Sequence, residues 1–427
     1  MSRNPATRSS KEHQPTSLLS PREKILFVSL AILLPTQLAK HWWPEWAFVS
    51  GIRIDYLSPT IYLTDLIIGL LLLSELTSFR KINRRWKAGE IMAFAIGIAA
   101  VALNIGNALR PMVAVQSWLR LGEIVVLFCY VRRKTALLYP IFIRFLPLAT
   151  ILVALITIVQ VVKQSSIGGP LYFLGERSFS VATPGIATVD FMGKRLLRPY
   201  ATLPHPNALA GFLLVALLIL AQKTRTEVRH RLLGRFITSS LAAIPALVLT
   251  ASQSTYFVAS LLFPMVLVRK KKMAIVIAAV LTLVVGLGVS RFLPLEKQSL
   301  LLRFRGVTEA RILASKNIIS GVGLGNYIPA LEEVKEISPA RTSPFLYYQP
   351  VHNIYLLLLT ETGLLGSVFG IIVLFKISNR FRQVPTTIGV PILAIALLSF
   401  TDHYWITLQQ TRLLMTIVLA FYWGKRK

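Results

Sequence analysis

The chain is poor in charged residues, and acidic residues are the scarcest of them. Only 15% of its 427 residues are charged and just 18 are Asp or Glu, whereas a soluble domain of this length carries about a quarter charged residues. This composition excludes a soluble enzyme, a disordered protein and a fibrous protein.

Cysteine and metal-binding motifs are scarce as well. Cys129 is the one cysteine of the sequence, so an intramolecular disulfide framework is excluded. Because it lies in an apolar run, we expect a buried thiol. The sequence contains no Asp-x-Asp, Glu-x-Asp or His-Glu-x-x-His pattern. The glycine-rich stretch 321–325 has no P-loop lysine after it, so neither a metal nor a cofactor is predicted.

The sequence is rich in hydrophobic residues, which occur in long runs. Hydrophobic residues make up 54% of the chain, in repeated runs near the roughly 20 residues that a helix needs to cross a bilayer. The sequence therefore predicts an all-α polytopic membrane protein with about twelve transmembrane helices. The expected spans are residues 25–40, 59–77, 90–109, 112–131, 140–162, 206–221, 236–250, 254–268, 273–290, 351–375, 387–400 and 406–423.

The basic residues predict how the chain is oriented in the membrane. A net charge of +29 would suggest nucleic acid in a soluble protein. Here the basic residues lie between apolar runs, which indicates membrane topology and contact with anionic lipids rather than with nucleic acid. With a cytoplasmic N-terminus, 28 of the 47 basic residues fall in inner segments. The positive-inside rule thus places both termini in the cytoplasm.

Two long loops are expected on the outer, extracytoplasmic face. The predicted order is a basic tail (1–24), helices 1–5 (25–163), a first outer loop (164–205), helices 6–9 (206–290), a second outer loop (291–350), and helices 10–12 with a basic end (351–427). We expect short interfacial helices in both loops. Their basic residues suit a phosphate-bearing ligand, although solvation or lipid headgroup contact is the simpler explanation for any single one.

Three histidines mark the outer edges of predicted spans. His205 ends the first outer loop, His352 ends the second, and His403 follows Asp402 at the last outer turn. A single imidazole at a membrane interface is usually an amphipathic anchor, but three on one face beside basic loops favour chemistry. Glu361 lies inside a span, where it indicates either a functional site or a helix-pairing role.

The segment around His352 resembles the hallmark of a known family. Residues 350–356 read Pro-x-His-Asn-x-Tyr-Leu, and Glu361-x-Gly363 with Gly366 follows. This pattern resembles the hallmark of the O-antigen ligase and polymerase superfamily. The stretch 303–310 with the glycine-rich 321–327 is similar to the segment that precedes this hallmark.

Two earlier segments add to the resemblance. Residues 198–210, which run from Arg198 through His205, look like the first outer-loop motif of the superfamily. Residues 250–254 resemble its short turn, but Ser252-Gln253 stands where the family often has Ser-Arg. The resemblance covers about 198–424 well and the first 190 residues by topology alone.

The resemblance implies a C-type glycosyltransferase fold. It also implies a metal-independent, inverting transfer at the outer face of the cytoplasmic (inner) membrane. The donor would be an undecaprenyl-diphosphate-linked glycan, and the acceptor hydroxyl would belong to a glycan, to lipid A-core or to a protein. Arg198 and Arg303 carry over as ligands of the diphosphate, and His352 as the general base.

Further residues carry over less specifically as groups that orient His352 or bind the acceptor. They are Asp402, His403, His205, Asn353 and Tyr355. An interfacial hydrogen-bond pair is the alternative for Asp402 and His403.

Other functions stay open on the sequence alone. An O-antigen or polysaccharide repeat-unit polymerase of the same superfamily is the alternative enzyme. A transporter of lipid-linked glycans is the nearest non-enzyme, because it would bind the same diphosphate. A secondary transporter with paired broken helices would carry polar residues near the midplane of both halves, whereas this chain concentrates polar groups in its two outer loops.

Overall fold

The structure, a computed structural model, describes residues 19–79, 87–227, 229–293, 297–337, 347–383 and 389–424. Residues 1–18 of the predicted basic tail, the basic end 425–427 and most of the basic segment 80–87 lie outside this part. The helices are α1 (Pro21–Leu33), α2 (Leu63–Phe79), α3 (Ala88–Gly106), α4 (Pro111–Arg133), α5 (Thr135–Lys163), α6 (Pro206–Thr226), α7 (His230–Leu249), α8 (Gln253–Leu267), α9 (Lys271–Phe292), α10 (Lys297–Lys316), α11 (Tyr327–Ala330), α13 (Ile354–Gln383), α14 (Val390–Leu398), α15 (Tyr404–Thr407) and α16 (Gln409–Trp423).

The protein is a mainly helical, multi-pass membrane protein. In the described residues, seven helices are long and apolar enough to cross a membrane: α3, α4, α5, α6, α7, α9 and Ile354–Ile372 of α13. The apolar helices α2 and α8 are shorter. Large apolar side chains along α3 and α9, such as Phe94 and Leu283, point outward and are exposed. Such exposure is stable when lipid rather than water surrounds the helices.

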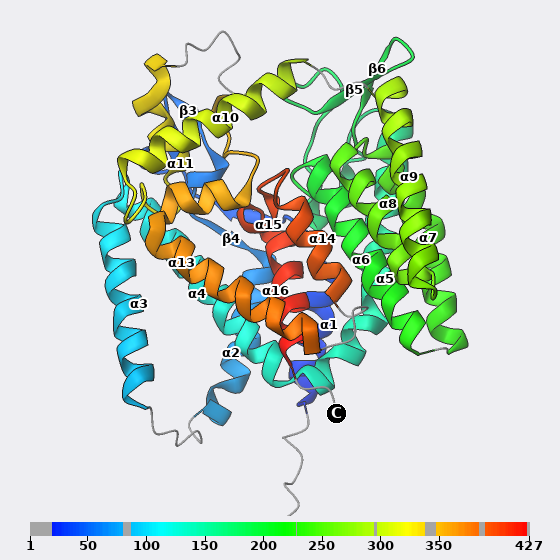
Figure 1. The fold of residues 1–427 in the computed structure, drawn as a ribbon, viewed down its shortest axis with the longest axis horizontal. Coiled ribbons are helices and arrows are strands. Elements are labelled where there is room, and N and C mark those ends of the chain that lie inside the picture. The colour runs from blue at the N-terminus through cyan, green and yellow to red at the C-terminus, as the bar shows by residue number, and fades with distance from the viewer. Residues whose placement is uncertain are drawn as a thin grey trace, which may run out of the picture.

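Helix α6 forms the centre of the bundle (Figure 1). Its residues from Pro206 to Gln222 are all buried, as expected of a helix that is apolar on every side. Helices α5, α7, α8, α14 and α16 pack against it. Gly211 allows a further close contact, with α15, because a Cβ atom there would lie 2.4 Å from the Tyr404 hydroxyl. The start of α6 and the chain around Tyr404 are thereby held together.

The long connections gather at one end of the bundle, which we call the loop end (Figure 1). Three antiparallel strand pairs lie in them: β1 (Ala39–His41) with β4 (Thr60–Tyr62), β2 (Phe48–Val49) with β3 (Ile52–Arg53), and β5 (Thr188–Phe191) with β6 (Lys194–Leu197). Helix α10 covers the α3–α4–α13 side of this end (Figure 1).

The described ends of the chain meet at the opposite end of the bundle. Near the start of α1, Glu23 pairs with Lys134 in the turn between α4 and α5. Gly424, just after α16, lies against Thr135 in the same turn, so closely that a Cβ atom would clash with it. The beginning of α1 and the end of α16 therefore lie at the same end of the bundle.

A glycine pair joins α13 to the second long loop. Gly363 interrupts α13 with φ 60° and ψ −159°, and Gly321 has φ 70°. The freed backbone of α13 pairs with the loop, since Leu364 N donates to Ile318 O at 2.8 Å. A Cβ atom on Gly363 would lie 2.3 Å from Ile319 O. Both positions therefore need glycine for conformation as well as for space.

Several local predictions were wrong. The first span, predicted at 25–40, is helical only to Leu33, because Pro35 follows and cannot continue a helix. The second, predicted from 59, begins with strand β4 and becomes helical at Leu63. The second loop contains a 20-residue helix, α10, rather than only short helices. Cys129 is exposed on α4, not buried, because it faces away from the bundle.

Candidate active site

Four segments far apart in sequence meet at the loop end. They contribute His205 at the start of α6, His352 just before α13, the pair Asp402–His403 before α15, and the arginines of the two long loops. The rings of His352 and His403 are 5.3 Å apart, centroid to centroid, in an edge-on arrangement. We call His205, His352, Asp402 and His403 the histidine cluster.

Asp402 connects α6 to the histidine cluster through its hydrogen bonds to Asn207 and His403. Its carboxylate is buried, and Oδ2 accepts a 2.8 Å hydrogen bond from Asn207 Nδ2 on α6. Oδ1 accepts a 2.8 Å bond from the backbone N–H of His403 and lies 4.0 Å from Nε2 of the same residue. Burial alone would raise the pKa of Asp402, but the neighbouring histidines and the Asn207 hydrogen bond hold it below its usual range. Asp402 therefore carries a negative charge among the imidazoles.

The two predicted phosphate ligands flank this cluster. Arg198 Nη2 donates to Asn207 Oδ1 at 2.6 Å, and its Nε donates to the Thr250 carbonyl at 2.8 Å. Arg303 Nη1 donates to the Thr401 carbonyl at 2.8 Å, one residue before Asp402. Both guanidiniums are thus anchored through part of their donor set. The donors that remain keep the fork geometry that suits phosphate oxygens.

The three histidines differ in how their nitrogens are used. His205 Nδ1 accepts from the backbone N–H of Asn207 at 3.1 Å, which caps α6. His403 Nδ1 shares a 2.8 Å hydrogen bond with Thr407 Oγ1. No described residue forms a hydrogen bond with the His352 ring, so both of its nitrogens are available to a substrate.

Burial keeps all three imidazoles neutral at pH 7. It lowers the pKa of His352 below 6.5, with Asp402 acting against this and Arg303 adding to it. Burial lowers the pKa of His403 to about 4 and that of His205 to about 3. A neutral His352 can accept a proton from a hydroxyl group, which is the task of a general base.

The same cluster has the composition of a metal site. One ligand atom from each of His352, Asp402 and His403 lies within 4.8 Å of the others. Two imidazoles and one carboxylate are a ligand set that zinc and similar ions accept. The sequence predicted Asp402 and His403 as groups that orient His352, but it predicted no metal, because these residues form no known metal-binding motif.

Two of the predicted site residues hold the backbone instead of facing the cluster. Asn353 Oδ1 accepts from Leu356 N at 3.0 Å and caps α13, while its Nδ2 donates to Phe400 O at 3.2 Å. Tyr355 donates its hydroxyl to Ala396 O at 3.1 Å. These bonds join the start of α13 to α14 and the turn before Asp402. An acceptor-binding role for Asn353 and Tyr355 therefore receives no support, whereas their bonds do orient the segment that carries His352.

Glu361 holds the second long loop in place. Its Oε1 accepts from the Tyr56 hydroxyl at 2.9 Å and from Tyr327 N at 3.1 Å. Its carbonyl accepts from Asn104 Nδ2 at 2.8 Å. Asn104 also donates to the carbonyl of Ser320 at 2.6 Å. The sequence left two roles open for Glu361, a functional site or helix pairing. These hydrogen bonds match helix pairing, because they join α3, α13 and the glycine-rich turn.

Sequence reasoning missed Asn207, Arg120 and Arg412. Asn207 lies within a motif that the sequence analysis singled out, but only the structure shows that it bridges Arg198 and Asp402. Arg120 and Arg412 interrupt the predicted spans 112–131 and 406–423. A charged residue inside a span is itself a signal of function, and it could have identified both.

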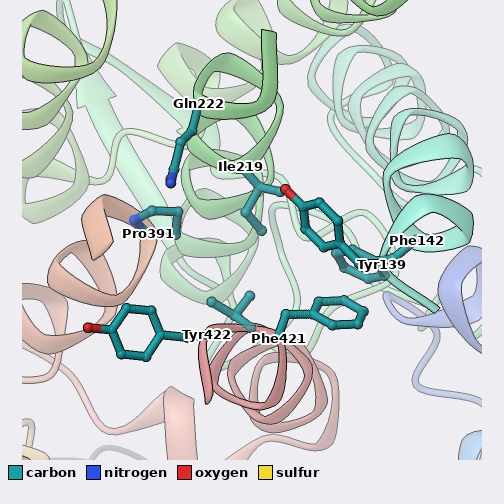
Figure 2. A pocket seen from close by; sticks show the side chains of 8 residues that line it. Tyr139, Phe142, Ile219, Gln222, Pro391, Phe421 and Tyr422 are labelled. Carbon is teal, nitrogen blue, oxygen red and sulfur yellow. The ribbon is translucent and has the colours of Figure 1, made fainter. Parts of the chain in front are cut away.

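A small pocket at the other side of the bundle is not a second candidate site. Tyr139, Ile219, Gln222, Pro391 and Phe421 surround it, from α5, α6, α14 and α16 (Figure 2). Its volume is about 30 Å³, which is enough for a single water molecule. The walls are mostly aromatic and aliphatic. It is therefore best understood as a packing gap.

Comparison with known proteins adds no assignment. No family model matches the chain, and the search of curated proteins gave no match either. A function must therefore be argued from the geometry of the histidine cluster and from the motifs that supply it.

Proposed function

We propose that this protein is a glycosyltransferase of the O-antigen ligase type. It would transfer a glycan from an undecaprenyl-diphosphate-linked donor to an acceptor hydroxyl, at the outer face of the cytoplasmic membrane. A C-type glycosyltransferase fold with twelve crossings belongs to the same proposal. One observation carries it: His352, whose ring nitrogens form no hydrogen bond with a described residue, lies beside Asp402, and the residues next to Asp402 anchor Arg198 and Arg303.

The arginines suit a lipid-linked diphosphate. The lipid of such a donor stays in the bilayer while its diphosphate lies at the interface, which is where Arg198 and Arg303 flank the cluster. As the glycosidic bond breaks, negative charge grows on the leaving diphosphate. Cationic donors already held in place by Asn207, Thr250 and Thr401 stabilise that charge without reorganising.

The imidazole supplies the other half of the reaction. His352 takes the proton of the acceptor hydroxyl, whose oxygen attacks the anomeric carbon as the diphosphate leaves. Asp402 stabilises the imidazolium that forms, since its carboxylate lies within 4.8 Å of a His352 nitrogen. A direct displacement of this kind inverts the anomeric centre.

Turnover of purified protein is the direct test. Lipid-linked donor and an acceptor glycolipid, mixed with the protein in detergent, should yield glycosylated acceptor without a membrane gradient. A transporter of lipid-linked glycans would give no product. A deletion strain distinguishes ligase from polymerase: lipid-linked polymer accumulates if a ligase is lost, and single repeat units remain if a polymerase is lost.

We expect the loop end to face outward. In a Cys129→Ser background, Ser178→Cys and Ser315→Cys should react with a membrane-impermeant maleimide on intact spheroplasts, because both positions are exposed at the loop end. Arg132→Cys, exposed at the opposite end, serves as the control and should react only after permeabilisation. The reverse pattern would invert the topology and place the site in the cytoplasm.

We expect activity to survive chelation. Arg198 and Arg303 supply the positive charge that a metal ion would otherwise bring to the diphosphate. Initial rates in excess EDTA should equal those in magnesium within about twofold. Loss of turnover in EDTA, with recovery on adding zinc, magnesium or manganese, would show instead that His352, Asp402 and His403 hold a catalytic metal.

The lowered pKa of His352 predicts a pH profile. A base with a pKa below 6.5 is unprotonated throughout the neutral range. The rate, as kcat/KM, should therefore be flat above pH 6.5 and should fall below that value as the imidazole takes up a proton. An acidic limb centred above pH 7 would assign the base to a different group.

A further inference from the structure

A second cavity lies next to the histidine cluster. Its volume is about 180 Å³. Segment 55–62, α4, α13, α15 and α16 enclose it between the loop end and the membrane-spanning part. The lining includes Tyr56, Gln116, Arg120, Glu361, Thr407 and Arg412.

Thr407 joins this cavity to the cluster. It lines the cavity, and its Oγ1 lies 2.8 Å from His403 Nδ1. On its other side the cluster reaches Arg198 through Asp402 and Asn207. The cavity and the Arg198 guanidinium are thus connected to the histidines through different residues. A molecule in the cavity and a diphosphate at Arg198 would both be close to His352.

The cavity walls combine apolar side chains with charged residues of both signs. Two basic residues, Arg120 and Arg412, and two acidic ones, Asp55 and Glu361, are among the lining residues, so the lining has no excess of basic residues. A balanced wall gives no strong preference for a phosphate group, which needs a net positive site. An acyl chain would use only the apolar part of this lining and would leave Gln116 Oε1 and Arg412 Nε, which are unpaired among the described residues, without partners.

A polyhydroxylated ligand fits such walls. Each sugar hydroxyl both donates and accepts hydrogen bonds, and the lining offers guanidinium donors, carboxylate acceptors and the hydroxyls of Ser58 and Thr60. Two polar atoms of the lining residues have no partner in the described structure, Gln116 Oε1 and Arg412 Nε. One is an acceptor and the other a donor.

We propose that this cavity binds the terminal sugar of the acceptor glycan. The inference rests on the glycosyltransferase function proposed above and gives it a second subsite. Arg198 and Arg303 hold the donor diphosphate, the cavity holds the acceptor sugar, and the hydroxyl to be glycosylated points toward His352. Arg120 and Arg412, which are costly inside a membrane span, then have a role in recognition.

Binding of a released acceptor oligosaccharide tests the site without any turnover. The probe is the oligosaccharide freed by mild acid from the envelope of the deletion strain, titrated calorimetrically into purified protein. Arg120→Gln and Arg412→Gln should each weaken binding by about tenfold or more, because each removes a charge-assisted donor. Arg53→Gln is the matched control: an exposed arginine of the same loop end that does not line the cavity.

A cavity-filling variant covers the case in which the arginine variants fail to fold. Met415→Phe adds volume from the cavity wall without touching a polar group, and it should reduce oligosaccharide binding similarly. Affinity for the lipid-linked donor should stay within about twofold in every variant. Wild-type protein that binds no oligosaccharide, or variants that bind it normally, would overturn the assignment.

Kinetics separate the failure of the site from the failure of the function. In the transfer assay the same variants should raise the KM for the acceptor and leave the KM for the donor unchanged. If the wild type transfers glycan and the acceptor KM does not move, the cavity is not the acceptor subsite and the function stands. If the wild type binds oligosaccharide but transfers nothing, the sugar site stands and the proposed reaction falls.

Discussion

His352→Gln should lower turnover by roughly two to four orders of magnitude, the usual range for loss of a general base. The amide has a similar volume but cannot take the acceptor proton at neutral pH. Donor affinity should stay close to that of the wild type, since the imidazole acts on the acceptor hydroxyl. Initial rates with lipid-linked donor measure the first effect, and equilibrium binding of the donor measures the second.

His230→Gln is the matched control for this prediction. His230 is an exposed histidine at the start of α7, separated from His205 by the whole length of α6, so the same chemical change there should leave turnover unaltered. A folded and fully active His352→Gln protein would reduce His352 to an interfacial anchor and end its catalytic role.

Arg303→Ala should weaken donor binding and turnover together, by roughly ten- to a hundredfold. The diphosphate is held in the ground state as well as in the transition state, so both parameters fall. Arg303→Lys should recover only part of the loss, because a point charge does not reproduce the bidentate fork. Donor titrations and initial rates on the same preparations give the comparison.

Arg311 supplies the control for Arg303, because it lies on the same helix, α10, and is exposed. Arg311→Ala should change neither donor binding nor turnover. Since Arg303 also donates to the Thr401 carbonyl, thermal unfolding of each variant must accompany the assay. An Arg303→Ala protein that is as stable as the wild type and binds donor normally would remove the arginine from the diphosphate site.

Hydropathy predicted the helices well because a bilayer leaves a chain few choices. Each of the twelve predicted spans overlaps a helix of the structure, since a backbone in lipid must satisfy its own hydrogen bonds. Among the described residues, seven of these helices are long and apolar enough to cross a membrane. The hydropathy pattern did not predict the structure of the loops. Strands β2 and β3 are two residues long, too short to show the alternation that would reveal them.

The sequence could predict which residues belong to the candidate site, but not which of them contact one another. His352, His403 and Asp402 stood out as polar groups at the edges of apolar spans. Nothing in one sequence shows that Asn207 reaches Asp402 across 195 positions. For the same reason the sequence could not decide whether Asn353 orients His352 or binds the acceptor, whereas the structure shows its side chain capping α13. Helix packing decides which polar groups come into contact, and the local sequence pattern does not predict that packing.

Asp402 and His403 have a consequence for how the protein is made. Asp402 and His403 lie in the turn after α14. Arg198 and Asn207, which contact the cluster from α6 and the loop before it, therefore leave the ribosome long before this pair. Throughout most of synthesis Asn207 therefore has no carboxylate to hold. In the proposed mechanism, a chain that stops before residue 402 would insert most of its helices but lack Asp402 and His403, so unfinished copies would not consume the donor.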